Sequence, residues 1–206
     1  MSRSRFAARP LSGSTGSVWT ILAVALMALA TAACARSPQV VVLSPPLSGP
    51  PGKIAAPRSV ELSVRDDRTS RVIGSRGGLY AETSTITTED DIAPGLRKLL
   101  AEKLAQQGYT VVPPGSGGEV QLSVDVQSLT YETGGSVLTE IKVSSSVGVT
   151  CVKGGETLTS RFETRHREEF ASAPDEAQNS ELINMVLGRT LDEVLSDREL
   201  RDFMSR

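Results

Sequence analysis

The predicted fold follows mainly from residues 120–162, VQLSVDVQSLTYETGGSVLTEIKVSSSVGVTCVKGGETLTSRF. Apolar and polar side chains alternate along most of it, which is typical of strands that bury one face. Gly134-Gly135 and Gly154-Gly155 interrupt the alternation and predict two tight turns. We therefore expect three consecutive antiparallel strands. The apolar parity changes after Val126, which predicts a β-bulge near Gln127 and Ser128.

The polar positions of these strands are expected to share one face, which helices leave open to water. They are Gln121, Ser123, Asp125, Gln127, Lys142, Ser144, Ser146, Thr150, Thr159, Arg161, Glu163 and Arg165. The candidate partner-binding residues are Ser144, Ser146 and Arg161, because the short serine side chains let a partner approach the backbone and a free sheet edge is a template for strand addition. The alternative is a merely solvated face, since polar-out alternation occurs in any half-buried sheet.

Outward from this stretch, strands are expected at 59–66, at 72–74 with 79–87, and at 109–112. Apolar residues three and four apart predict one helix ending at Gly108 and another from about Ser180. Capping-box spacing links Thr88 with Asp91, and Ser196 with Glu199 before a short terminal helix. The predicted fold is α+β: a mainly antiparallel sheet with helices packed on one face, a two-layer sandwich formed by a single domain, residues 59–206.

Residues 1–33 have the composition of a secretory signal peptide. Three arginines and no acid precede an uncharged run at 18–30, and small residues follow it. As a helix this run would span about 20 Å, against roughly 30 Å of hydrocarbon, so it is short for a permanent anchor. An uncleaved anchor is the alternative, because no charge occurs between Arg9 and Arg36.

The small residues before Cys34 resemble the lipobox of bacterial lipoproteins, in which the cysteine carries a diacylglyceryl group and becomes the N-terminus. Thr31 departs from that pattern, which has leucine three residues before the cysteine. The alternative is cleavage after Ala30-Thr31-Ala32, which would release a soluble periplasmic protein. Ala35 is not the aspartate of lipoproteins retained in the inner membrane, so lipidation predicts a periplasm-facing protein of the outer membrane.

Residues 34–58 are expected to form a lipidated N-terminus and a proline-rich tether. Six of the eleven prolines of the chain lie between Ala35 and Arg58, and proline favours extended, semi-rigid backbone. The apolar residues 39–43 leave two interpretations open, a free linker or a short strand at a sheet edge.

Composition and motifs argue against several functional classes. After residue 33 the chain is net acidic, which disfavours nucleic acid as a partner. The glycine runs 74–78 and 115–118 lack the Gly-Lys-Ser/Thr of a phosphate loop and predict turns. His166 has no serine or cysteine paired with it by motif, and Cys151 has the parity of a buried thiol. The sequence predicts no catalytic residues, no metal site and no cofactor.

The order of these features resembles the YajG family of bacterial lipoproteins. The resemblance covers the signal ending in cysteine, the stretch 42–46, the strand with Asp66 and Arg68, the helix closing at 108–111 and the final segment LDEVLSDRELRDFM, residues 191–204. It implies an envelope lipoprotein without established enzymatic activity, and it transfers Cys34 alone, as the acylated residue.

Two functional classes remain. The first is a non-enzymatic binding or assembly module that is anchored to the membrane by lipid and holds an unidentified envelope protein, glycan or lipid. Within it, an alternative is an auxiliary lipoprotein of a lipid or lipopolysaccharide transport system. The second class is a soluble periplasmic hydrolase, for which the sequence offers no recognisable nucleophile and base.

Overall fold

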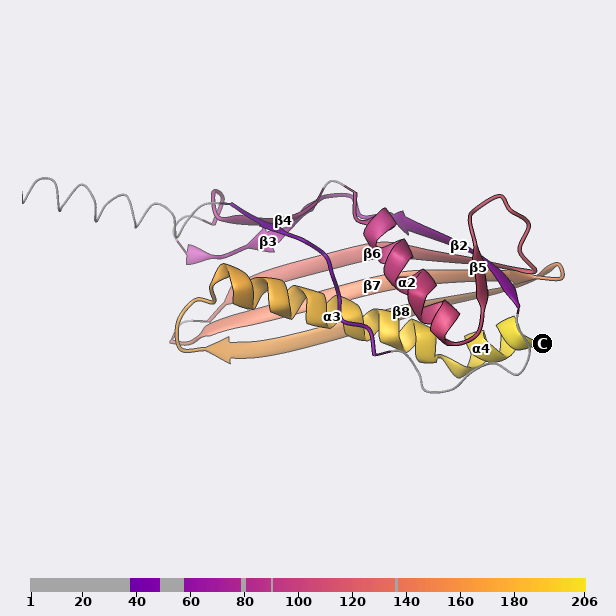
Figure 1. Ribbon diagram of the computed structural model, residues 1–206. Helices are drawn as coiled ribbons and strands as arrows, with labels where there is room; N and C mark the ends of the chain where they lie inside the picture. The colour runs from indigo at the N-terminus through magenta and orange to yellow at the C-terminus, as the bar shows by residue number, and fades with distance from the viewer. Residues whose placement is uncertain (1–37, 49–57, 79–80, 90, 136) are drawn as a thin grey trace, which may run out of the picture. The chain divides into compact units, whose positions relative to one another are not determined.

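The computed structural model describes residues 38–48, 58–78, 81–89, 91–135 and 137–206 (Figure 1). Pro38–Arg206 forms one compact unit. Its strands are β1 Gln39–Val41, β2 Ser59–Asp66, β3 Val72–Ser75, β4 Thr85–Thr88, β5 Thr110–Val112, β6 Val120–Gly134, β7 Thr139–Lys153 and β8 Glu156–Phe170. Its helices are α2 Ala93–Gln106, α3 Glu176–Ser196 and α4 Arg198–Ser205.

Strands β6, β7 and β8 are the predicted antiparallel meander. Each is 15 residues long, and their register runs without a break from Val120 opposite Lys153 to Thr139 opposite Phe170, apart from one shift. That shift lies between Val126 and Ser128, where the parity change predicts a bulge. Gly154 and Gly155 have positive φ angles, which a tight turn requires and which glycine adopts without steric cost.

The remaining strands join the other edge of β6 and make the sheet mixed. The first half of β6 pairs in parallel with β2, which in turn pairs in parallel with β5. The second half pairs with β3 at Gly74 opposite Tyr131, and β4 and then β1 follow outward. Gly74 is needed there, because a Cβ at this position would come within 1.8 Å of the Tyr131 carbonyl oxygen.

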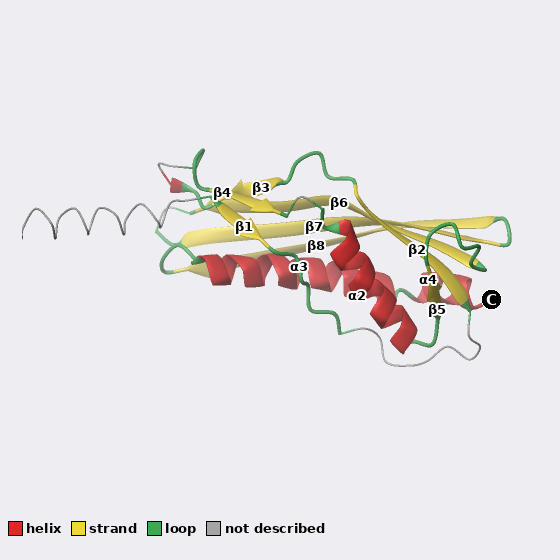
Figure 2. Cartoon of the chain, turned by 45° about the horizontal axis from the view of Figure 1, so that its top comes forward, coloured by secondary structure: helices red, strands yellow, loops and turns green. Residues whose placement is uncertain are grey.

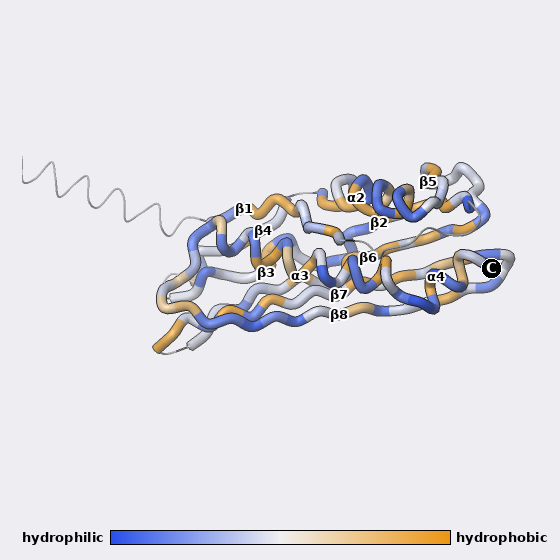
Figure 3. The backbone as a smooth tube through the Cα atoms, turned by 60° about the horizontal axis from the view of Figure 1, so that its bottom comes forward, coloured by the Kyte–Doolittle hydropathy of each residue, from blue (hydrophilic) through white to orange (hydrophobic). Residues whose placement is uncertain are grey.

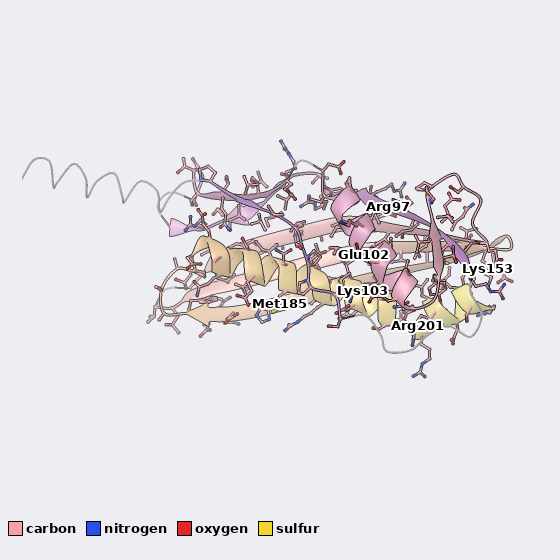
Figure 4. The ribbon with its side chains drawn as sticks, in the orientation of Figure 1. Arg97, Glu102, Lys103, Lys153, Met185 and Arg201 are labelled. Carbon is pink, nitrogen blue, oxygen red and sulfur yellow. The ribbon has the colours of Figure 1, made fainter. Side chains whose placement is uncertain are left out.

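The helices pack on one face of the sheet, as predicted, so the α+β fold class is confirmed (Figure 2). The core lies between the two layers and takes its side chains from both, among them Leu62, Val124 and Val147 from the sheet and Leu100 and Leu187 from the helices. Lys153, labelled in Figure 4, fixes the end of α4 to β7, because its Nζ donates to the carbonyl oxygens of Met204 and Arg206, both at 2.9 Å.

The helix ends differ from the predicted capping boxes. Helix α2 begins at Ala93, and its N-cap Ile92 makes no side-chain cap, so the Thr88 and Asp91 box does not form. The start of α3 lies four residues before Ser180, where Asp175 and Gln178 form a complete capping box. The N-cap of α4 is Asp197 rather than Ser196, because its carboxylate accepts from the Leu200 N–H at 2.7 Å.

Residues 38–48, in the segment predicted as a tether, pack along α3 in the same direction. Of the two interpretations, the strand is confirmed, since Gln39–Val41 pairs in parallel with β4. The Gln39 amide donates to the carbonyl oxygen of Glu176 at 2.7 Å. Further along, the Asn184 amide binds Ser44 N and Val42 O, and Asp192 accepts from Ser48 N at 3.0 Å. Cys34, the predicted lipidation site, lies outside the described residues.

Candidate functional site

The candidate site is the face of β6, β7 and β8 opposite α3, which we call the open face. No helix among the described residues covers it, and the odd-numbered residues of β8, Thr157 to Glu169, are all exposed. The register places the predicted residues Lys142, Ser144 and Arg165 in rows with further polar residues across the three strands. One row joins Thr130, Ser144 and Arg165, and the next joins Glu132, Lys142 and Arg167.

Ser144 lies at the centre of this face and is half-buried. Its hydroxyl is 2.7 Å from the hydroxyl of Thr130 on the neighbouring strand. On the other side, Ser144 is opposite Arg165, whose guanidinium donates to the Glu163 carboxylate at 2.6 Å. The two short hydroxyl side chains form a low floor between longer charged ones.

Ser146 is not accessible, which corrects the expectation that it faces water. Only 1% of it is exposed. The Arg161 Nε donates to its hydroxyl at 2.9 Å, and the Gln127 amide oxygen lies 3.4 Å from the same hydroxyl. Gln127 is the additional residue of the bulge, and its side chain lies over Gly148, where a Cβ would come within 2.4 Å of its Nε2. Arg161 and Gln127 therefore cover Ser146, so of the two candidate residues Ser146 and Arg161, only Arg161 is available to a partner.

Asp125 is also less exposed than predicted, with 7% of its surface open. The parallel register places Arg65 of β2 directly opposite, and their side chains form a two-bonded ion pair at 2.8 and 3.0 Å. Ser123 donates to the same carboxylate at 3.0 Å. The Asp125 carboxylate is therefore hydrogen-bonded within the protein by Arg65 and Ser123.

The end of the open face near Lys142 carries a network of charges. Glu140 accepts from Lys142 at 2.9 Å and from Arg167 at 2.5 Å, and Arg167 also contacts Glu169. The hydrogen bond from Lys142 lowers the pKa of Glu140, with Arg167 acting in the same direction. The carboxylate is therefore held in its charged form, and the face presents both signs of charge in fixed positions.

A depression of about 380 Å³ lies between these groups on the open face. It is lined by Thr130, Glu132, Lys142, Val143, Ser144, Arg165, His166 and Arg167. Seven of the eight lining residues have polar or charged side chains, which can form hydrogen bonds with a polar partner. Thr130, Glu132 and Arg167 were not predicted from the sequence as residues of this face. The signal for the first two was the parity change at the bulge, which moves the even-numbered residues of β6 after it onto this face.

The residues considered for catalysis are not brought together. Cys151 is fully buried opposite Leu122 and Leu158, and burial raises the pKa of its thiol to about 11. His166 is opposite Val143, which lies eight residues before Cys151 on β7. Its Nε2 is 3.3 Å from a Glu168 carboxylate oxygen. In the described ranges, no group of three histidine, cysteine or acidic residues is placed to hold a metal ion.

The glycine run 115–118 is a turn, as predicted, and it binds an anion of its own chain. The Glu61 carboxylate accepts from the backbone N–H groups of Gly115 at 2.6 Å, Gly117 at 3.1 Å and Gly118 at 3.4 Å. These bonds, with Gly115 foremost, lower the pKa of Glu61. The donors that a phosphate would need are therefore occupied.

Among the described residues, no helix is both long and apolar enough to cross a membrane. A family model described as "Uncharacterized lipoprotein" (Lipoprotein_16) matches residues 46–205 of the chain. No curated protein matches the chain.

Several solved structures are similar. Protein XCC0632 from Xanthomonas campestris has a TM-score of 0.52 at 11% identity, over 76% of this chain and 92% of that one. At this identity the likeness shows the fold alone. Lipoprotein GNA1162 from Neisseria meningitidis has a TM-score of 0.35 at 13% identity, over 68% and 100% of the two chains. A minor lipoprotein from Acinetobacter baumannii has a TM-score of 0.35 at 12% identity, over 72% and 90%.

Proposed function

Because the chain belongs to the family of uncharacterized lipoproteins whose model matches residues 46–205, we propose that it is a non-enzymatic binding or assembly module. In this proposal Cys34 carries the lipid, the protein faces the periplasm from the outer membrane, and the open face holds a polar partner, a protein or glycan of the envelope. The YajG-like order of motifs supports the finer family assignment.

The observation that carries the proposal is the depression on the open face. A sheet whose outer face is only solvated needs no concavity there, whereas here two hydroxyl side chains form a floor between charged residues on three strands. The charges are fixed by ion pairs before a partner arrives, so little side-chain entropy is lost on binding. Rows of opposite charge favour one orientation of a partner over others.

A photo-crosslinking residue at Ser144, Arg161 or Arg165 tests this surface in intact cells. We expect a discrete adduct from these positions, identified by mass spectrometry of the crosslinked species. Glu102, labelled in Figure 4, and Gln106 are matched controls, because they are exposed on α2, which packs on the opposite face of the sheet. Adducts from the helix positions alone, or none from the strand positions, would contradict the proposal.

Lipidation is tested separately by metabolic labelling with radioactive palmitate. We expect label in the wild-type protein and its loss in Cys34→Ser. Two or more acyl chains give stable anchoring where one gives reversible binding, so the variant should also leave the membrane fraction. If the wild-type protein takes up no label, then Thr31 prevents processing and the protein is not a lipoprotein.

A further inference from the structure

The strand directions fix where the chain enters the domain. β1 is parallel to β4, β4 is antiparallel to β3, and β3 is parallel to β6, so β1 runs opposite to β6. β6 runs towards the turn that connects it to β7. Pro38, which precedes β1, therefore lies at the end of the sheet where that turn is (Figure 1).

The distance from this end to the lipid attachment site is short. Because residues 39–41 are paired in the sheet, Cys34 is only four residue-to-residue steps before Pro38. A fully extended chain covers at most about 3.5 Å per residue, so Cys34 cannot lie more than about 14 Å from Pro38. The 25-residue tether that the prolines predict is not available to hold the domain away from the membrane.

The same end of the domain exposes apolar side chains. After β6, Val137 is 91% exposed and Leu138 is 44% exposed. Figure 3 shows hydrophobic colouring where β7 begins at this end. β6 continues three residues beyond Tyr131, which lies at the level of Gln39 across the sheet, so the turn projects about 10 Å past that level. This projection is comparable with the reach of the four residues that precede Pro38.

We propose that this end of the domain rests on the lipid surface, with Val137 and Leu138 inserted among the headgroups and the upper acyl chains. The proposal rests on the proposed function, since it requires lipid at Cys34. The three long strands then extend away from the membrane, with the β7–β8 turn at the far end. The depression lies near the membrane end, within reach of a partner at the membrane surface.

The charges at this end indicate whether apolar insertion or attraction to anionic lipid headgroups dominates the contact with the membrane. At the ends of β7 and β8, Glu140 pairs with Lys142 and Arg167, Glu169 pairs with Arg167, and a Glu168 carboxylate oxygen lies 3.3 Å from His166 Nε2. Such a rim is not the basic cluster that anionic lipids attract. The insertion is therefore apolar, and it requires no anionic lipid.

The test places an environment-sensitive fluorophore on the acylated full-length protein, in the Cys151→Ala background so that one free thiol is present. The probe is attached at Val137→Cys, and at Glu156→Cys as the matched control. Glu156 is exposed next to the β7–β8 turn, about 45 Å along the strands from the other end. The proteins are reconstituted into phosphatidylcholine vesicles with and without a lipid that carries a quencher near the headgroup.

We expect quenching by about twofold or more at residue 137 and none at residue 156, because interfacial side chains reach about 5–10 Å into the headgroup and acyl boundary. Equal, water-like emission at both positions from an acylated, vesicle-bound protein overturns this proposal and leaves the proposed function standing. A protein that carries no acyl chain, as measured by intact mass, instead refutes the proposed function. Quenching at both positions shows that the domain lies flat, which also overturns the proposal.

Discussion

The Cys151 side chain lies on the apolar face of β7 and is part of the hydrophobic core. Its thiol is fully buried, and burial raises its pKa to about 11, so the fraction present as the reactive thiolate near pH 7 is very small. We expect a bulky maleimide to leave the native protein unlabelled over hours. Labelling should appear together with unfolding in urea.

Substitutions at Cys151 separate packing from charge. Cys151→Ala should lower the free energy of unfolding by about 1–2 kcal/mol, because it leaves a small cavity. Cys151→Asp should prevent folding, because it buries an unpaired carboxylate between Leu122 and Leu158. Urea denaturation followed by circular dichroism measures both, and a native-like Cys151→Asp would show that this position is open to water.

The sequence was sufficient to predict the burial of Cys151, because alternation alone assigns its side chain to the apolar face. It was not sufficient for Ser146. Its parity places it correctly on the open face, but its burial results from the Arg161 and Gln127 side chains that lie over it. Such a cover depends on the position of the bulge and on cross-strand register, which are not local properties of the sequence.

At the scale of elements, β1 depends on α3 as much as on its neighbouring strand. The Asn184 side chain on α3 accepts from Ser44 N at 2.7 Å and donates to Val42 O at 3.1 Å. Asn184→Ala should therefore cost about 1–2 kcal/mol of local stability, with faster amide hydrogen exchange at Ser44 and its neighbours. Glu181→Ala, at an exposed position one turn earlier on the same helix, is the control and should leave this exchange unchanged.

If the exchange rates of residues 39–44 are the same in both variants, the side chain of Asn184 does not hold this segment. The sequence could not choose between linker and strand for residues 39–43, because the strand partner β4 lies 47 residues further along the chain (Gln39 opposite Ile86) and the partners on α3 lie about 140 residues further along. Helix starts were predictable only in part. The spacing of Thr88 and Asp91 satisfies a capping box, but Ile92 is the residue that takes the N-cap position.

For the whole molecule, stability should fall as the pH falls through the range in which carboxylates titrate. In the part of the chain that the structure describes, three carboxylates have lowered pKa values: Glu61 through backbone N–H groups of the 115–118 turn, Asp66 through Arg68, and Glu140 through Lys142. A lowered pKa in the folded state gives stability that is present above the ordinary carboxyl pKa, about 4, and is lost as these groups protonate below it.

The urea midpoint should therefore be constant from pH 7 to about pH 5 and decrease steadily below about pH 4. The Asp66→Asn variant should be less stable at pH 7 and should show a smaller decrease in acid, because one of the three titrating groups is gone. Equal slopes for the variant and the wild type would show that the Arg68 pair does not contribute to the pH dependence.

At this scale the sequence was sufficient to predict the fold class, the meander with its turns, and the side of the sheet that the helices cover. The parallel pairs of β2 with β5 and β6 were not, because each joins strands about 50 to 60 residues apart and leaves no mark in local alternation. The open face was predictable as a surface. The depression on the open face was not predictable. It forms because the register places short side chains from neighbouring strands in the same row, between longer ones.

The docking of residues 38–48 along α3 also sets an order of events during synthesis. This segment is synthesised early, but its hydrogen-bond partners on α3 follow 137 to 144 residues later. Contacts this distant in sequence form late in folding. Until α3 has been synthesised and packed, residues 38–48 lack these partners, so Cys34, if it is lipidated as we propose, is modified before this segment is held in the domain. In that proposal, the packing of α3 then brings the folded domain close to its lipid anchor.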